Sequence, residues 1–292
     1  MGKKIILITG AAKGIGRASA ERLIGAGFTV YGGDIAFDEM ADLEANGLHR
    51  LHMDVSDDES VTTAVSKVMS EQGQIDGLFA NAGYACIGMF ECVPIEEAKK
   101  QFEVNVWGVA RSIQAVLPHM RDAAPEGRGR ILITSSVAGK ISAPGMGWYP
   151  ASKHSVEAIA DSLRMEMKAC FPGIKVVVIE PGFVTTGLYG ASVPTWMSAR
   201  DSPAAKIYRQ QLENSINNFK RTFEAGSPVE TISEVVHEAL TADEPEIRYA
   251  PNPDSWGAVY GKRLMHLSGQ LDQILISRWL GRLDDDQPAT ID

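Results

Sequence analysis

Near its start the chain reads IILITGAAKGIG, from Ile5 to Gly16, and a helical pattern from Arg17 to Ala26 follows. The continuous apolar run Ile5–Ile8 predicts a strand that is buried on both faces. Glycines after such a strand let the backbone approach a phosphate, and the helix that follows offers free N–H groups and a positive dipole end. A tight turn that needs glycine only for its shape is the alternative, and the loop alone does not decide between them.

Strand and helix patterns continue to alternate after this unit. Strands are predicted at residues 28–33, 48–53, 75–80, 131–134, 175–179 and 247–250, and helices at 56–72, 94–120, 149–170 and 228–240. Ser56 is the expected N-cap of the helix at 56–72. This alternation is typical of an α/β fold with a Rossmann-like, doubly wound parallel sheet and helices on both faces. The sequence shows neither an internal repeat nor a linker, so we expect residues 1–292 to form a single domain.

Two segments do not follow the alternation. Residues 187–221 carry apolar side chains without a strand period, which predicts a partly helical lid over the site. A surface insertion packed on the core is the alternative. In residues 252–282, leucines and Trp279 recur at helical spacing and predict a C-terminal helical extension.

The composition restricts the possible partners and location. The chain has 292 residues and a formal net charge of -9, without a basic block. An acidic surface of this kind argues against nucleic acid and anionic membranes as partners. The three cysteines lack C-x-x-C spacing, so we expect no metal site and a reducing, cytoplasmic environment. No apolar run reaches the length of a membrane span.

Tyr149 and Lys153 are four residues apart in the stretch WYPASK, which ends at Lys153. On a helix they would lie on one face, about one turn apart. An ammonium beside a phenol favours the phenolate, which would lower the pKa of Tyr149 and make it a general acid/base near neutral pH. An ordinary helix start with one exposed lysine is the alternative.

Polar and glycine residues follow most of the predicted strands. These residues, which would lie at carboxyl ends of strands, are Gly10, Asp34, Asp54, Asn81, Ser136 and Pro181. Ligands bind at the carboxyl ends of parallel strands, so we expect one composite site. Asp34 follows the glycines by about twenty residues, where a carboxylate can accept hydrogen bonds from an adenosine ribose. A helix N-cap is an equally natural role for this aspartate.

Taken together, these motifs resemble the short-chain dehydrogenase/reductase family, in its Tyr-x-x-x-Lys branch. The family's T-G-x-x-x-G-x-G corresponds to Thr9–Gly16, its N-A-G to Asn81–Gly83 and its P-G-x-V-x-T to Pro181–Thr186. The catalytic serine and the helix asparagine of the family match Ser136 and Asn105. The resemblance covers residues 3–186 and, more loosely, extends to residue 250. The long C-terminal part is loosely similar to hydroxysteroid and retinol dehydrogenases.

The resemblance implies an oxidoreductase that acts on CH–OH groups with NAD(P). Tyr149 would be the acid/base, Ser136 would bind the substrate oxygen, Lys153 would lower the Tyr149 pKa and bind the nicotinamide ribose, and Asn105 would hold a water in a proton relay. The expected cofactor-binding residues are Gly10, Lys13, Gly14, Ile15, Gly16, Asp34, Asp54, Val55, Asn81, Ala82, Gly83, Tyr149, Lys153, Pro181, Gly182, Val184 and Thr186. Ser135, beside Ser136, is expected to be structural.

NAD is the expected cofactor, with NADP second. Asp34 would repel a 2′-phosphate, and burying a carboxylate against a phosphate costs several kcal/mol. In some members of the family a basic residue at the place of Lys13 contacts that phosphate, but Lys13 can also turn into solvent. An NADP-preferring carbonyl reductase is therefore the alternative function.

The expected substrate residues are Ser136, Met146, Trp148, Phe183, Leu188, Trp196 and Met197. They are mostly apolar and offer no arginine clamp for a carboxylate, which favours a hydrophobic secondary alcohol or its ketone. The resemblance also implies a homodimer or homotetramer. A non-catalytic NAD-binding redox sensor is a competing hypothesis, although it would not require Ser136, Tyr149 and Lys153. A sugar-nucleotide epimerase or dehydratase is a further alternative, for which the C-terminal part shows no evident nucleotide site.

Overall fold

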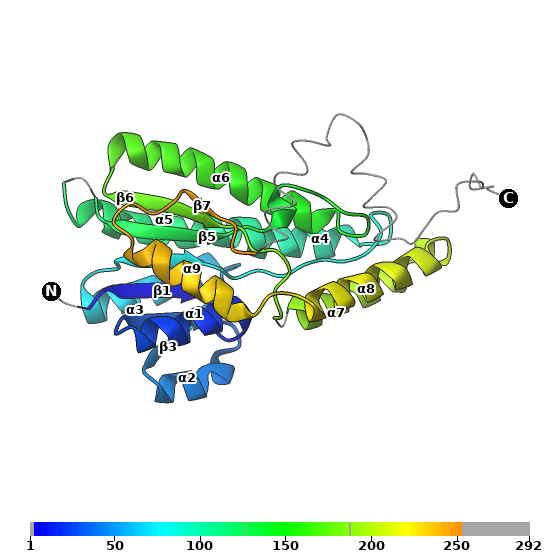
Figure 1. Ribbon diagram of the computed structural model, residues 1–292, viewed down its shortest axis with the longest axis horizontal. Helices are drawn as coiled ribbons and strands as arrows, with labels where there is room; N and C mark the ends of the chain where they lie inside the picture. The colour runs from blue at the N-terminus through cyan, green and yellow to red at the C-terminus, as the bar shows by residue number, and fades with distance from the viewer. Residues whose placement is uncertain (1–2, 126, 187, 253–292) are drawn as a thin grey trace.

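The computed structural model describes residues 3–125, 127–186 and 188–252. Within them, seven strands form one sheet in the order β3-β2-β1-β4-β5-β6-β7. Figure 1 shows this sheet with helices around it. The strands are β1 (Ile5–Thr9), β2 (Thr29–Asp34), β3 (Leu48–His52), β4 (Gly77–Ala80), β5 (Gly129–Thr134), β6 (Ile174–Ile179) and β7 (Arg248–Tyr249), and all their pairings are parallel. The strand order reverses between β1 and β4, which is where ligands bind in sheets of this type.

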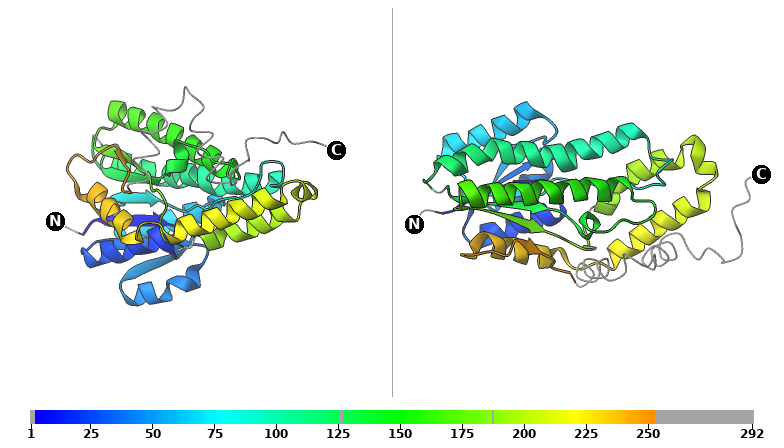
Figure 2. Two further views of the ribbon diagram at one scale, coloured as in Figure 1. Left: turned by 45° about the vertical axis from the view of Figure 1, so that its right-hand side comes forward. Right: turned by 90° about the horizontal axis from the view of Figure 1, so that it is seen from above.

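Helices cover both faces of the sheet. On one face lie α3 (Asp58–Gln72), α5 (Gly108–Asp122) and α6 (Trp148–Cys170), whose apolar side chains form one core with the strands. On the other lie α1 (Gly14–Gly25), α2 (Ala41–Ala45) and α9 (Val229–Thr241), which form a second core. The right-hand view of Figure 2 shows these two layers on opposite sides of the sheet. The predicted doubly wound α/β fold is confirmed.

The helix predicted over residues 94–120 is divided into three parts. It consists of α4 (Ile95–Phe102), a π-helical turn (Glu103–Trp107) and α5. Such π turns are rare and often occur at functional sites. Asn105 lies in the middle of this turn. Pro118 stays within α5, which continues to Asp122.

The helix whose N-cap is expected at Ser56 begins at Asp58, one residue later than that cap implies. Its N-cap is Asp57, whose carboxylate accepts a hydrogen bond from the Glu59 amide at 3.1 Å. Ser56 instead donates its hydroxyl to Asp54 at 2.6 Å. An aspartate fills this position as well as a serine, so the sequence allowed both starts.

The segment expected to be a lid forms a helical hairpin. Its helices are α7 (Leu188–Arg200) and α8 (Arg209–Glu224), which project to one side of the sheet (Figure 1). Thr195 fastens α7 to the preceding part of the chain, because its hydroxyl accepts a hydrogen bond from the Ile87 amide at 3.2 Å. That this hairpin acts as a lid over the site stays a prediction. The predicted C-terminal extension lies outside the described residues, apart from Asn252. None of the helices described here is long and apolar enough to span a membrane.

Candidate active site

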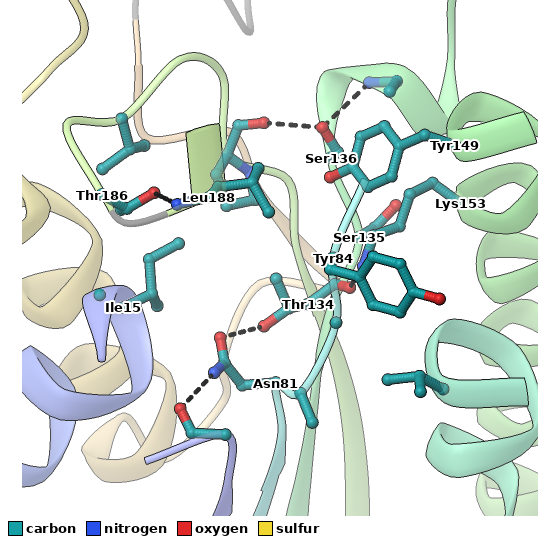
Figure 3. A pocket seen from close by; sticks show the side chains of 18 of the residues that line it. Ile15, Asn81, Tyr84, Thr134, Ser135, Ser136, Tyr149, Lys153, Thr186 and Leu188 are labelled. Atoms are coloured by element: carbon teal, nitrogen blue, oxygen red, sulfur yellow. Dashed lines mark hydrogen bonds between the residues drawn. The ribbon is translucent and has the colours of Figure 1, made fainter. Parts of the chain in front are cut away.

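A cavity of about 790 Å³ opens at the carboxyl ends of the strands. Figure 3 shows Ser136, Tyr149 and Lys153 on one side of it and Ile15, Thr186 and Leu188 on the other. The predicted site residues that line it are Gly10, Lys13, Gly14, Ile15, Asp34, Asp54, Val55, Asn81, Ala82, Gly83, Ser136, Met146, Tyr149, Lys153, Pro181, Gly182, Phe183, Val184, Thr186 and Leu188. The fold therefore gathers residues that are up to 178 positions apart in the sequence, from Gly10 to Leu188, around one space.

The glycine loop is shaped to admit a ligand close to the backbone. Gly10 has φ +70°, and a Cβ there would lie 2.9 Å from Ala82 Cα. A Cβ on Gly16 would lie 2.1 Å from Gly10 O, so only glycine fits although Gly16 does not itself line the cavity. Lys13 precedes α1 without a side-chain cap, which leaves the first N–H groups of the helix available. This arrangement suits the pyrophosphate of a dinucleotide.

Asn81 joins the carboxyl ends of three strands. Its amide nitrogen donates to Thr9 O at 3.1 Å. Its side-chain oxygen accepts from the Thr134 hydroxyl at 3.2 Å (Figure 3). Its backbone N–H donates to the Thr9 hydroxyl at 3.0 Å. Asn81 thus holds β1, β4 and β5 together where the cavity opens.

Asp34 lies at the end of β2 and accepts two backbone hydrogen bonds. They come from the amides of Ala12 at 3.0 Å and Ala36 at 2.9 Å. The carboxylate is thereby fixed against the glycine loop and lines the cavity. Lys13 turns to Glu39, with Nζ 2.7 Å from the nearer carboxylate oxygen. The alternative role as a helix N-cap is not observed, because Ala36 is the N-cap of the 3-10 turn that follows. Asp34 instead supports the glycine loop and faces the cavity, where the ribose role stays a prediction.

Tyr149 and Lys153 are both buried on the first turns of α6. Lys153 Nζ donates to Thr134 O at 2.8 Å and lies 5.8 Å from the centre of the Tyr149 ring. Ser136 lies beside Tyr149 and can hydrogen-bond its hydroxyl (Figure 3). In the structure the Ser136 hydroxyl donates to Pro181 O at 3.4 Å. The Ser136 hydroxyl also accepts from the Ala138 amide at 3.1 Å, which orients it toward the cavity.

Burial dominates the protonation of this pair. It raises the pKa of Tyr149 to about 12, and the hydrogen bond from Ser136 opposes the shift. It lowers the pKa of Lys153 to about 8, and the negative charge of Glu157 opposes that shift. The expectation that Lys153 lowers the Tyr149 pKa is not met in this structure, because loss of water outweighs the ammonium and the ammonium points at Thr134 O.

Asn105 holds the loop after β4 against α6. Its side-chain oxygen accepts from the Tyr84 amide at 3.0 Å, and its nitrogen donates to Tyr84 O at 2.9 Å and to the Ser152 hydroxyl at 3.1 Å. Ser152 in turn donates to Tyr149 O at 2.7 Å. Asn105 is fully buried and does not line the cavity, so its contacts here are those of a positioning residue. Ser152 was not selected from the sequence, although its place in the Tyr-x-x-x-Lys stretch puts it on the same helix.

The wall beyond Ser136 and Tyr149 is apolar. It includes Met146, Phe183 and Leu188, as predicted, together with Phe223 from α8. Among the described residues, the charged side chains that line the cavity are Lys13, Asp34, Asp54 and Lys153, and none of them is an arginine.

Three predicted substrate residues do not line this cavity in the described structure. Trp148 stacks on Phe90, with ring centres 4.8 Å apart. Trp196 packs between α7 and α8 and donates its indole N–H to Leu212 O at 3.2 Å. Met197 follows it on the same helix and is also absent from the lining. For Trp196 the cause is clear, since irregular apolar spacing does not reveal that α7 and α8 bury side chains against each other.

Comparisons with known proteins agree with this geometry. The family model described as short chain dehydrogenase matches residues 4–195. The chain is 33% identical over 255 residues to the NADPH-dependent 3-dehydrocapnine reductase of Ornithobacterium rhinotracheale, covering 85% of this chain and 87% of the relative. It is 38% identical over 187 residues to the 3-ketodihydrosphingosine reductase of Bacteroides thetaiotaomicron, covering 64% and 66%. A short-chain dehydrogenase/reductase from Burkholderia phymatum, solved with NAD, superposes with a TM-score of 0.77 at 25% identity and covers 99% of this chain and 98% of its own.

Proposed function

Because the chain belongs to the short-chain dehydrogenase/reductase family, and so is an oxidoreductase of alcohols or ketones with a nicotinamide cofactor, we propose that it interconverts a hydrophobic secondary alcohol and its ketone with NAD. The observation that carries this proposal is that Ser136 and Tyr149 lie next to an apolar wall at one end of the cavity. None of the described residues that line the cavity is an arginine, which favours a substrate that has no carboxylate beside its reacting carbon.

The side chains at this end of the cavity can accept and donate the proton that moves in the reaction. The nicotinamide cofactor supplies the acceptor or donor for the hydride. During oxidation Tyr149 would accept the hydroxyl proton as its phenolate, and during reduction it would return a proton to the carbonyl oxygen. Ser136 would donate a hydrogen bond to the substrate oxygen and hold it against Tyr149. Lys153, as an ammonium, would favour the phenolate.

The preference for NAD is supported by the charge around Asp34. Its carboxylate faces the cavity, and Glu39 binds the Lys13 ammonium that could otherwise pair with a 2′-phosphate. An NADP-preferring carbonyl reductase is the second candidate. It is favoured by the presence of Lys13 on the lining and by the relative that is named NADPH-dependent.

A homo-oligomer is part of this proposal. Trp107 at the start of α5 and Met165 on α6 are large apolar side chains that are exposed in the single chain. Covering both with a second copy would remove apolar surface from water and so favour association.

The proposal is tested by measuring kcat/KM for a panel of secondary alcohols that runs from 2-propanol to 2-octanol and 1-phenylethanol, with NAD and with NADP, from the absorbance of the reduced cofactor. We expect turnover with NAD that rises with the apolar size of the alcohol. Higher kcat/KM with NADP would select the second candidate. Tight NAD binding without turnover of any alcohol or matching ketone would instead favour the redox sensor.

A further inference from the structure

Four charged side chains form an inner cluster behind the catalytic residues. Two carboxylates, Glu157 and Glu180, are only 6% and 2% exposed. Lys140 Nζ lies 2.7 Å from Glu157 Oε2 and 3.2 Å from Glu180 Oε1. Arg248 reaches both carboxylates at 3.1 Å. Carboxylates buried to this degree cost free energy of desolvation even when they are paired, so their presence behind an active site calls for a reason beyond stability.

Each member comes from a segment that carries part of the site. Lys140 follows the 3-10 turn Val137–Gly139, which begins directly after Ser136. Glu157 lies on α6, and Glu180 directly precedes Pro181 of the cofactor loop. Arg248 lies on β7, which pairs with β6. The cluster therefore ties the serine turn, the catalytic helix and the cofactor loop to one another.

Glu157 has a direct relation to the catalytic lysine. It lies four residues after Lys153 on α6, one turn along the same face. Lys153 is 3% exposed, and the Glu157 charge raises its pKa against the effect of burial. Glu157 Oε1 lies near Gly139 and has no hydrogen-bond partner among the described residues, so the ion pairs of this carboxylate are made through Oε2.

We propose that Glu157 is a positioning residue of the reaction: its buried negative charge balances Lys153, and its ion pairs fix α6 against the Ser136 turn and the cofactor loop. This inference rests on the proposed function, in which Tyr149 is the acid/base. Removing the negative charge of Glu157 should then shift the titration of the Tyr149–Lys153 pair in a predictable direction.

The sign of that effect follows from the groups around Glu157. They are Tyr149, Lys153 and Asp161 on α6, Lys140 after the serine turn, Glu180 at the end of β6 and Arg248 on β7. A nearby negative charge makes it harder for the Tyr149–Lys153 pair to lose a proton, and coupled groups of this kind titrate as a pair. Neutralising Glu157 should thus move the titration of the pair to lower pH, whereas removing the positive Lys140 should move it to higher pH.

The experiment compares the wild type with Glu157→Gln, Lys140→Met and Asp161→Asn. Asp161 contacts the same Arg248 but is 44% exposed and lies two turns from Lys153, so its variant controls for disturbance of the cluster. Two readouts are taken for each protein. One is the pH dependence of kcat/KM for the best alcohol of the panel with NAD. The other is the ultraviolet absorbance of the Tyr149 phenolate, isolated by subtracting the same protein carrying Tyr149→Phe.

We expect both midpoints to fall by about one pH unit in Glu157→Gln, a tenfold change in proton affinity, and to rise in Lys140→Met. We expect the kcat/KM plateau of Glu157→Gln to fall at least about tenfold, because neutral Lys153 supports the phenolate poorly. Asp161→Asn should keep both midpoints. Should Glu157→Gln not fold, Glu157→Asp, which keeps the charge, should keep the wild-type midpoints, and Lys140→Met still tests the sign.

The inference would be overturned if Glu157→Gln and Lys140→Met lowered the melting temperature but left both pH midpoints unchanged. The cluster would then have only a structural role. A failure of the proposed function looks different. In that case Tyr149→Phe would keep near wild-type kcat, whereas the phenolate titration would still report on Glu157.

Discussion

Replacing Lys153 with methionine should abolish turnover and yet stabilise the fold near pH 7. Burial lowers the Lys153 pKa from 10.5 to about 8, and each pKa unit corresponds to about 1.4 kcal/mol. Keeping this ammonium in the folded protein therefore costs about 3 kcal/mol. The variant also loses the hydrogen bond to Thr134 O, worth about 1 kcal/mol. The net gain in the free energy of unfolding is about 2 kcal/mol.

The pH dependence distinguishes this explanation from better packing. A lysine whose pKa falls on folding imposes its full cost below the lower pKa, and the cost disappears as the pH rises from about 8 toward 10.5. The advantage of Lys153→Met should therefore be largest near pH 7 and mostly gone near pH 10, as measured by urea unfolding. Lys99→Met is the matched control, because Lys99 is 66% exposed and should change stability little at either pH. A variant less stable than wild type near pH 7, or an advantage that does not shrink with pH, would refute the reasoning.

Four further results are expected. Tyr149→Phe should lower kcat at least about 10²-fold and leave NAD affinity, measured by calorimetry, almost unchanged; a kcat near wild type would exclude Tyr149 as the acid/base. Asp34→Asn keeps an acceptor for the loop amides but removes the charge, so kcat/KM with NADP should rise relative to NAD by at least about tenfold; an unchanged ratio would contradict the ribose role. Phe223→Ala should lower kcat/KM for 2-octanol by roughly tenfold but spare 2-propanol, whereas Trp196→Ala should lower the melting temperature and affect both alcohols alike; the reverse pattern would restore Trp196 to the substrate wall. Light scattering at micromolar concentration should find a dimer or tetramer, and a monomer would contradict the oligomer.

The fold and the place of the site were readable from local patterns. The apolar run at Ile5–Ile8 and the glycines after it fix a strand, a turn and a helix start within a few residues. Parallel strands bring their carboxyl ends to one edge, so residues such as Asp34 and Asn81 had to meet once the alternation was recognised. The Tyr149–Lys153 pair was likewise set by helical spacing alone.

Other features depend on partners that are far away in the chain. Arg248 meets Glu157 across 91 positions because β7 joins β6 at the sheet edge, and nothing local to either residue indicates that contact. The prediction that Trp196 lines the cavity is wrong for the same reason. Its indole N–H bonds to Leu212 O on α8, and hydrophobic periodicity does not indicate how α8 packs against α7. Sequence spacing predicts what lies beside a residue within one element, whereas packing between elements needs the structure.

The pKa of Tyr149 shows why this limit matters for chemistry. Spacing placed an ammonium one turn away and predicted a lower pKa, and the ammonium is indeed near, 5.8 Å from the ring. Burial nevertheless raises the pKa to about 12, and it also lowers the pKa of Lys153, which weakens the ammonium that should oppose it. The sign is therefore decided by exclusion of water, to which Met146 and Phe183 contribute as members of the apolar cluster around Tyr149. It follows that a neighbouring charge such as that of Glu157 can shift the protonation of Tyr149 and Lys153 without a change in either residue.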